Sequence, residues 1–285
     1  MTKKPLADIS YFPGCSLATS ARESNLSLLN LCRRLGFNLV ELEDWNCCGS
    51  SSAHSIRSDL AFDLPARNLS LTPPGLPLLA ACPSCISHLR HAQLHLQKDE
   101  TARIRYKKMW GRDVDPDLHI LHFFELLAEA DLSSLVKEHD GGLKGIRFVP
   151  YYGCMLARPP AMNREKNYHG LMEKMLASLN AKPLLWGYAS RCCGTFLSVA
   201  RPDVVTPIVN RIIRGAIEAG ADCIVTACAM CHLNLEIRCN LRKQIPIFHF
   251  SELLSLALGA DDYKDWFSRH LVDPRPLLKA KQLIS

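Results

Sequence analysis

Thirteen cysteines are distributed unevenly along the 285 residues, and ten of them fall into two sets with the same order. In each set a single cysteine comes first, two adjacent cysteines follow, and a C-x-x-C motif closes the set. The first set comprises Cys15, Cys47, Cys48, Cys82 and Cys85, and the second comprises Cys154, Cys192, Cys193, Cys228 and Cys231. In both sets a glycine precedes the single cysteine and another follows the adjacent pair. The repetition of five residues in one order indicates an internal duplication.

The segments that lead into these cysteines have the patterns of short strands. DISYFPGC and IRFVPYYGC predict buried strands that end at Cys15 and Cys154. PLLAACPSC and DCIVTACAMC predict strands that run directly into the C-x-x-C motifs, and FNLVELEDWNCCG predicts a strand that ends at the first adjacent pair. LHILHF and IPIFHF, later in each half, predict fourth strands that lead into helices.

Helical patterns separate these strands. SARESNLSLLNLCRRLG opens with Ser20 and Glu23, three residues apart as in a capping box, and its leucines keep helical spacing up to Gly36. PDVVTPIVNRIIRGAIEAG predicts a long amphipathic helix that ends at Gly220. Strands that alternate with helices form parallel sheets with right-handed crossovers. We therefore expect an α/β fold of two tandem, pseudo-symmetric Rossmann-like units.

All ten repeated cysteines are expected at one kind of place in this fold, beyond the carboxyl ends of the strands. Ligands of open parallel sheets gather at these ends, on loops that a rigid sheet holds in place. We place the first unit at residues 1–140 and the second at residues 141–285, with the seam in KEHDGGLKG, residues 137–145. Each unit would then carry one five-cysteine set.

Composition and charge exclude several classes of protein. With 48% hydrophobic and 22% charged residues the chain is expected to be globular, and its formal net charge of +6 is modest. The basic stretch RIRYKKMWGR is more typical of a solvated face than of a nucleic-acid surface. We find no apolar run of the roughly 18 residues that a membrane span needs, and no signal peptide. We expect a cytoplasmic protein with reduced thiols, in which so many cysteines indicate metal binding or redox chemistry.

Five cysteines per set leave more than one kind of metal site open. A C-x-x-C motif suits a tetrahedral zinc ion, but zinc would leave the adjacent pairs and the single cysteines unused. A cubane iron–sulfur cluster needs four thiolates, so that either one cysteine per set is free for chemistry or the cluster is not an ordinary cube. A cluster of several irons explains the adjacent pairs best, because each thiolate can bind a different iron or bridge two.

The complete pattern resembles the CCG domain of the heterodisulfide reductase B subunit over nearly the whole chain. The motifs that carry the resemblance are YFPGCSL, ELEDWNCCGSSSAHS, LPARNLSL, ACPSC, YYGCMLARPP, RCCGTFLSVARPDVV, EAGADCIVTACAMCHLNLEIR and IPIFHFSELLSLALG. The resemblance implies two non-cubane [4Fe-4S] clusters, each held by all five cysteines of its set. GSSSAH departs from the methanogen enzymes, in which proline follows the first pair, and looks closer to bacterial relatives, including those of sulfur oxidisers.

The resemblance also implies a function. In the family the clusters face a shared cleft, in which a substrate disulfide is cleaved in two one-electron steps and each thiolate is captured at an iron. The implied partners are a ferredoxin-like C subunit and a flavoprotein A subunit, and the implied substrate is a small disulfide or sulfur carried by a lipoate-binding protein. We find no G-x-G-x-x-G motif or phosphate loop for a flavin or nicotinamide, so electrons must be exchanged with another polypeptide. The alternative is a non-catalytic electron-transfer subunit of a succinate- or quinone-linked oxidoreductase.

Several histidines are weaker candidates for a role at the site. His54, just past the first adjacent pair, is a candidate proton donor to a leaving thiolate. His122 and His249 occupy equivalent ends of the fourth strands, where a core histidine is the simpler interpretation. The three histidines of residues 88–95 have helical spacing, which is typical of a solvated or partner-facing stripe.

Three further cysteines lie outside the repeat. Cys32 lies among leucines of an expected helix and Cys223 begins an expected strand, so both are predicted to be small core residues. Cys239 has no clear assignment from the sequence.

Overall fold

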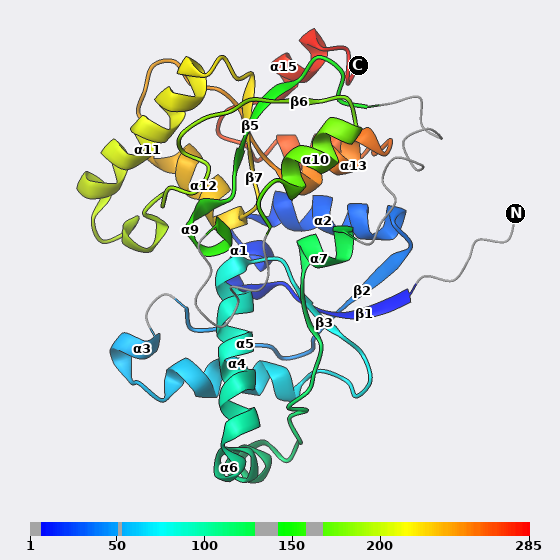
Figure 1. The fold of residues 1–285 in the computed structure, drawn as a ribbon, viewed down its shortest axis with the longest axis vertical. Helices are drawn as coiled ribbons and strands as arrows, with labels where there is room; N and C mark the ends of the chain where they lie inside the picture. The colour runs from blue at the N-terminus through cyan, green and yellow to red at the C-terminus, as the bar shows by residue number, and fades with distance from the viewer. Residues whose placement is uncertain (1–6, 51–52, 129–141, 158–167) are drawn as a thin grey trace, which may run out of the picture.

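The structure is a computed structural model, and residues 7–50, 53–128, 142–157 and 168–285 of it are described. These residues form two four-stranded sheets with parallel strand pairs and helices around them (Figure 1). The first sheet has the order β2-β1-β3-β4 and the second has the order β6-β5-β7-β8. The two orders correspond strand for strand. The α/β fold of two tandem Rossmann-like units is therefore confirmed, and the duplication extends from the cysteines to the fold.

The first unit contains the strands β1 (Ala7–Phe12), β2 (Phe37–Glu41), β3 (Leu78–Ala80) and β4 (Ile120–His122). Its helices are α1 (Gly14–Ala18), α2 (Arg22–Arg34), α3 (Ala53–Ile56), α4 (Leu60–Ser70), α5 (Pro83–Lys98), α6 (Glu100–Trp110) and α7 (Phe123–Ala128). Each strand is followed by at least one helix, as the alternating pattern predicts.

The second unit contains the strands β5 (Arg147–Tyr151), β6 (Lys182–Pro183), β7 (Cys223–Thr226) and β8 (Ile247–His249). Its helices are α9 (Gly153–Ala157), α10 (Leu171–Ser178), the 3-10 helix η2 (Thr195–Leu197), α11 (Pro202–Glu218), α12 (Ala229–Arg238), α13 (Phe250–Ala257), α14 (Tyr263–Phe267) and α15 (Arg275–Ala280). The long helix predicted to end at Gly220 is α11. The predicted boundary between the units, within residues 137–145, falls largely outside the described residues and stays a prediction.

Two local predictions are wrong. The capping box at Ser20 does not form: α2 begins at Arg22 without a side-chain cap, because the preceding residues form a turn in which Ala21 N–H donates to Ser16 O (2.8 Å). The strands before the adjacent cysteines also stop short of them. After Glu41, the positive φ of Asp44 (54°) breaks the extended backbone, so a loop carries the chain to the pair.

Side chains along the strands alternate between two apolar cores. Tyr11 of β1 faces a core shared by both units, whereas Phe12 faces a core of the first unit alone. In the second unit Phe148 faces the shared core, and Val149 and Tyr151 face a separate core under α11 and α12. Strands buried on both faces are characteristic of parallel sheets covered by helices.

The shared core fixes the two units against each other. Helix α2 packs against α13 between the sheets (Figure 1), and Ser27 Oγ hydrogen-bonds Ser251 Oγ at 2.7 Å. Phe124 of α7 rests on Phe250 of α13, with ring centroids 4.9 Å apart, and Phe124 is fully buried. Within the described part of the chain, no helix is long and apolar enough to cross a membrane.

Replacing Phe124 by alanine tests whether this core couples the units. We expect Phe124→Ala to lower the free energy of unfolding by about 3–5 kcal/mol, because a buried ring is lost and a cavity remains. The apparent Tm should fall by roughly 10 °C in a single transition, measured by scanning fluorimetry. Leu185→Ala is the control, since Leu185 is 100% exposed and should leave the Tm unchanged. Two separate transitions in the wild type would contradict the coupling.

Candidate metal centre

The ten repeated cysteines line one pocket between the two units, which we call the cysteine pocket. Cys15 and Cys154 lie in the first turns of α1 and α9, directly after the first strand of each unit. Cys82 and Cys228 are the N-cap residues of α5 and α12. The strand ends of both sheets thus bring the two five-cysteine sets to the same place, although the sets are far apart in the sequence.

The two cysteines of an adjacent pair contact different partners. Cys47 Sγ lies 3.7 Å from Cys15 Sγ, whereas Cys48 Sγ lies 3.3 Å from Cys85 Sγ. The second set has the corresponding contacts, because Cys192 interacts with Cys154, and Cys193 Sγ lies 3.5 Å from Cys231 Sγ. None of the thirteen cysteines forms a disulfide. A further thiol contact, between Cys82 and Cys228, joins the two sets.

Each set has an open side and a buried side. Cys15 and Cys192 are exposed and their neighbours Cys47 and Cys154 are half-buried. The other three thiols of each set are buried: Cys48, Cys82, Cys85, Cys193, Cys228 and Cys231. A molecule that enters from solvent would therefore meet the single cysteine and the first cysteine of the adjacent pair.

Glycine follows each adjacent pair because the backbone at that position is left-handed. Gly49 and Gly194 have φ values of 77° and 78°, which side chains other than glycine rarely adopt. The N–H groups of the same two glycines donate to the thiols of Cys47 (3.4 Å) and Cys192 (3.3 Å). The repeated CCG motif therefore supplies a backbone donor to one sulfur atom in each set.

Neighbouring thiols shift one another's pKa in opposite directions. Hydrogen bonds with Cys47 and Cys85 lower the pKa of Cys48 to about 4, and the contact with Cys48 raises the pKa of Cys85. In the second set, the hydrogen bond with Cys154 lowers the pKa of Cys192 to about 6, and the same contact raises the pKa of Cys154. Thiols this close cannot all ionise unless a positive charge lies among them.

An iron–sulfur cluster fits this set of donors. No lysine or arginine is among the described residues that line the cysteine pocket, so the protein itself supplies no cation there. Metal binding deprotonates coordinating thiols, and thiolates are the usual ligands of iron–sulfur clusters. One tetrahedral zinc ion per set would leave a fifth thiol unused. The number and type of the clusters, and the ligand role of each cysteine, stay predictions.

The described lining of the pocket also includes residues that the sequence did not single out, among them Ser16, Met155, Thr195, Phe196 and Met230. Ser16 Oγ donates a hydrogen bond to Met230 Sδ (2.5 Å) and so joins the two units beside the thiols. Ser16 directly follows Cys15, and Met230 lies inside the second C-x-x-C motif. Their positions within the cysteine motifs were the signal that could have found them.

The candidate histidines differ in their surroundings. His54 lies on α3, is exposed, and is not among the residues that line the cysteine pocket, so its role as a proton donor stays a prediction. His122 and His249 are buried at the strand ends. Phe124 N–H donates to His122 Nδ1 (3.1 Å), and His249 Nδ1 lies 2.6 Å from Ser251 Oγ. His249 thus has the contacts of a core histidine, whereas His122 Nε2 is buried without a hydrogen-bond partner among the described residues.

The histidines of residues 88–95 pack on the neighbouring helix. The rings of His91 and His95 lie 4.9 Å and 4.5 Å from the ring of Phe62 in α4. This stripe is therefore neither fully solvated nor part of the cysteine pocket.

The cysteines outside the repeat also have defined places. Cys32 and Cys223 are buried in the shared core, as predicted, and burial raises the pKa of Cys32 to about 12. Cys239 is half-buried at the C-terminal end of α12. None of the three lines the cysteine pocket in the described residues.

Comparison with known proteins identifies the family. The cysteine-rich domain named CCG matches the chain twice, at residues 9–90 and 148–236. The chain belongs to the CCG family of cysteine-rich domains. The two matches contain both complete five-cysteine sets, one set in each.

Two relatives of this CCG protein are named as subunits of reductases. The 8-methylmenaquinol:fumarate reductase membrane anchor subunit of Wolinella succinogenes is 26% identical over 283 residues, 95% of this chain and 99% of the relative. The B subunit of the ferredoxin:CoB-CoM heterodisulfide reductase of Methanosarcina mazei is 24% identical over 270 residues, 88% of this chain and 89% of the relative. A crystal structure of a hypothetical protein from Helicobacter pylori has a TM-score of 0.73 at 12% identity. It covers 94% of this chain and 52% of the solved chain, which supports the fold alone.

Gly14→Ala tests whether the position of the Cys85 thiol matters for metal binding. A Cβ atom on Gly14 would lie 2.9 Å from Cys85 Sγ, so this thiol would have to move. If Cys85 is a cluster ligand, we expect iron per chain to fall toward half of the wild-type value. Iron and acid-labile sulfide in anaerobically purified protein measure this.

Gly36→Ala is the matched control. Gly36 also has a positive φ (87°), but no atom lies within 4 Å of its added Cβ. The Gly36→Ala variant should therefore have the same kind of backbone strain as Gly14→Ala but keep the wild-type iron content. Full iron in Gly14→Ala would contradict a ligand role for Cys85.

Proposed function

We propose that this CCG protein is the iron–sulfur subunit of a heterodisulfide-reductase-like complex, and that it performs thiol–disulfide or sulfane-sulfur redox chemistry. The observation that carries the proposal is the single pocket lined by both five-cysteine sets. Two clusters that share one pocket, with Cys15 and Cys192 exposed at its open side, suit a substrate disulfide whose two halves each reach one cluster. The relative from Methanosarcina mazei, named as the B subunit of a heterodisulfide reductase, supports the same class of chemistry.

Each cysteine set would hold one four-iron cluster through its five thiolates. When bound, the clusters would supply one-electron transfer and iron atoms with affinity for thiolates. The backbone N–H groups of Gly49 and Gly194 would hold the outer sulfur atoms in place on the open side of each set. The Ser16–Met230 contact would keep the two sets at a fixed separation, so that both halves of one disulfide could be accommodated.

The substrate class follows from the lining of the pocket. Met155, Met230 and Phe196 offer an apolar surface beside the thiols, and the described lining residues include no basic group for an acidic headgroup. A small disulfide, or sulfur on a lipoate-type arm, fits such a lining. We place the protein in the cytoplasm, with a ferredoxin-like C subunit and a flavoprotein A subunit as partners, because the sequence offers no flavin motif of its own.

A second candidate function is supported by a different observation. The relative from Wolinella succinogenes, with 99% of its length matched, is named for menaquinol and fumarate rather than for a disulfide. By analogy, this chain would pass electrons between a quinone-linked partner and a reductase without binding a disulfide. The two functions differ in whether a small molecule enters the cysteine pocket.

Viologen oxidation by the anaerobic protein distinguishes the two functions. Reduced methyl viologen would replace the natural electron donor, and the acceptors would be a mixed small disulfide, lipoamide and a menaquinone analogue. We expect oxidation of viologen with a disulfide but not with the quinone. Each disulfide takes up two electrons and two protons and yields two thiols. Oxidation with the quinone alone would favour the second function.

Serine variants relate this activity to the cysteine sets. Cys48→Ser and Cys193→Ser should each lower iron toward half and reduce disulfide turnover severely, because serine is a poor replacement for thiolate on iron. Cys239→Ser, a change outside the cysteine pocket, should leave the iron content and the disulfide turnover at their wild-type values. Full iron and full turnover in Cys48→Ser would contradict a joint ligand role for the adjacent pair.

A further inference from the structure

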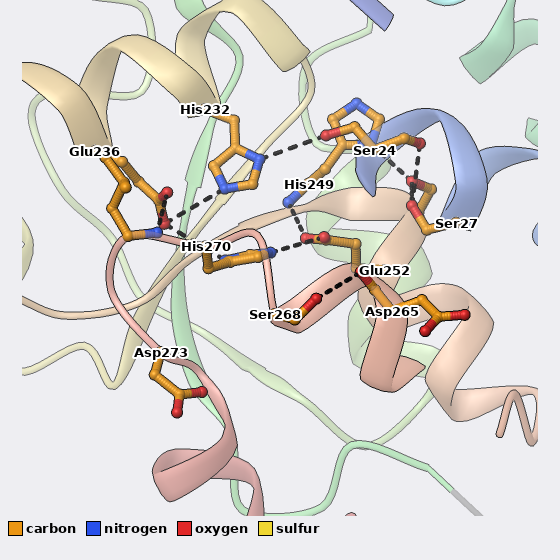
Figure 2. Close-up of polar contacts among 12 residues, drawn as sticks. Ser24, Ser27, His232, Glu236, His249, Glu252, Asp265, Ser268, His270 and Asp273 are labelled. Atoms are coloured by element: carbon orange, nitrogen blue, oxygen red, sulfur yellow. Dashed lines mark hydrogen bonds and ion pairs between the residues drawn. The ribbon is translucent and has the colours of Figure 1, made fainter. Parts of the chain in front are cut away.

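A second group of metal-binding side chains lies away from the cysteine pocket. We call it the histidine–glutamate cluster; it comprises His232, Glu236, Glu252 and His270 (Figure 2). His232 and Glu236 lie one turn apart on α12, Glu252 lies on α13, and His270 follows α14. All four side chains are at most 4% exposed. Four ionisable groups are thus buried together where charge is costly.

Three atoms of the cluster face one another without hydrogen bonds. Within the described residues, His232 Nε2, Glu236 Oε1 and His270 Nδ1 are all buried and have no hydrogen-bond partner. Glu236 Oε1 lies 3.6 Å from His232 Nε2 and 3.4 Å from His270 Nδ1. Buried polar atoms are nearly always satisfied. These three make only two mutual contacts, both longer than an ordinary hydrogen bond, and a bound ion would satisfy all three.

The two distances from Glu236 Oε1, 3.4 Å and 3.6 Å, are close to the edges of a coordination tetrahedron. Zinc bonds of about 2.0–2.1 Å in a tetrahedral arrangement place neighbouring ligand atoms about 3.3–3.4 Å apart. The octahedral arrangement at the same bond length would require edges of about 3.0 Å. The rings of the two histidines lie with their centroids 4.8 Å apart, so both can reach a common ion.

The remaining atoms of these side chains are held as in known metal sites. His270 Nε2 lies 2.8 Å from Glu252 Oε1, which makes a carboxylate–histidine pair and leaves Nδ1 directed at Glu236 Oε1. His232 Nδ1 lies 3.4 Å from Ser24 Oγ, and Leu271 N–H donates to Glu236 Oε2 (2.9 Å). Each of the three side chains thus has one atom engaged and the other directed into the cluster (Figure 2).

Charge also favours a divalent cation at this point. Glu236 and Glu252 bring two carboxyl groups against the imidazoles of His232 and His270 in a region almost without solvent contact. A divalent ion with two neutral imidazoles would balance both carboxylates.

We propose that His232, Glu236 and His270 bind a zinc ion, with Glu252 orienting His270. Two imidazoles and one carboxylate suit zinc, and a water molecule would complete the tetrahedron. The ion would fasten the segment after α14 to α12, whose first turn carries Cys231. This structural site is separate from the cysteine pocket and does not depend on the proposed redox function.

Metal analysis of untagged protein tests the proposal. The full chain would be purified without oxygen, incubated with Zn²⁺, desalted and assayed for zinc and iron by mass spectrometry. We expect about one zinc ion per chain in addition to iron. Zinc X-ray absorption should show nitrogen or oxygen ligands at about 2.0 Å and no sulfur at about 2.3 Å. Zinc bound through sulfur, or less than about 0.2 zinc per chain, would overturn the proposal in favour of a His270 cation shared by two carboxylates.

Matched variants assign the ion to these side chains. Glu236→Gln and His270→Asn should lose zinc and keep the wild-type iron content. Glu218→Gln and His119→Gln are the controls, because both residues lie outside the cluster. Undiminished zinc in Glu236→Gln would overturn the site, and the absorption spectrum of the wild type decides independently if a variant fails to fold.

Discussion

The packing of α2 against α13 is the contact on which the arrangement of the whole molecule depends. It lies in an apolar core that one face of each sheet supplies, and a buried pair of serines crosses it. Within each sheet the strand pairs are parallel, and the two sheets have equivalent strand orders. Packing them through this core therefore brings the carboxyl ends of the strands of both sheets to one side. Two cysteine sets that are distant in the sequence then line the same pocket. A change in this core would separate the sets even if each sheet stayed intact.

Duplication explains many local details of the pocket. Equivalent glycines adopt equivalent left-handed conformations, and equivalent thiols contact each other in both units. Each unit also repeats the hydrogen bond from the backbone of its strand-end histidine to a glutamate three residues later, His122 to Glu125 and His249 to Glu252. The second of these glutamates takes on another role in the histidine–glutamate cluster. Its equivalent in the first unit, Glu125, pairs with Arg90 instead. The two equivalent glutamates therefore have different partners.

Much of the fold could be predicted from the sequence because cysteine spacing and strand patterns are local signals. The two C-x-x-C motifs at helix starts and the fourth strands fall where their patterns indicate. The capping box at Ser20 does not form because Ser20 lies in a turn that precedes the first residue of α2. The histidine–glutamate cluster could not be predicted, because His270 and His232 meet only through the path of the chain after α13. The ligand roles of the ten cysteines rest on thiolate chemistry, which the fold permits and a metal assay decides.

We propose that the two five-cysteine sets hold iron, one cluster in each unit. Iron and acid-labile sulfide, counted in the anaerobically purified full chain, test it most directly. We expect about eight irons per chain, from two four-iron clusters. Negligible iron, with zinc bound through cysteine sulfur in its place, would contradict it.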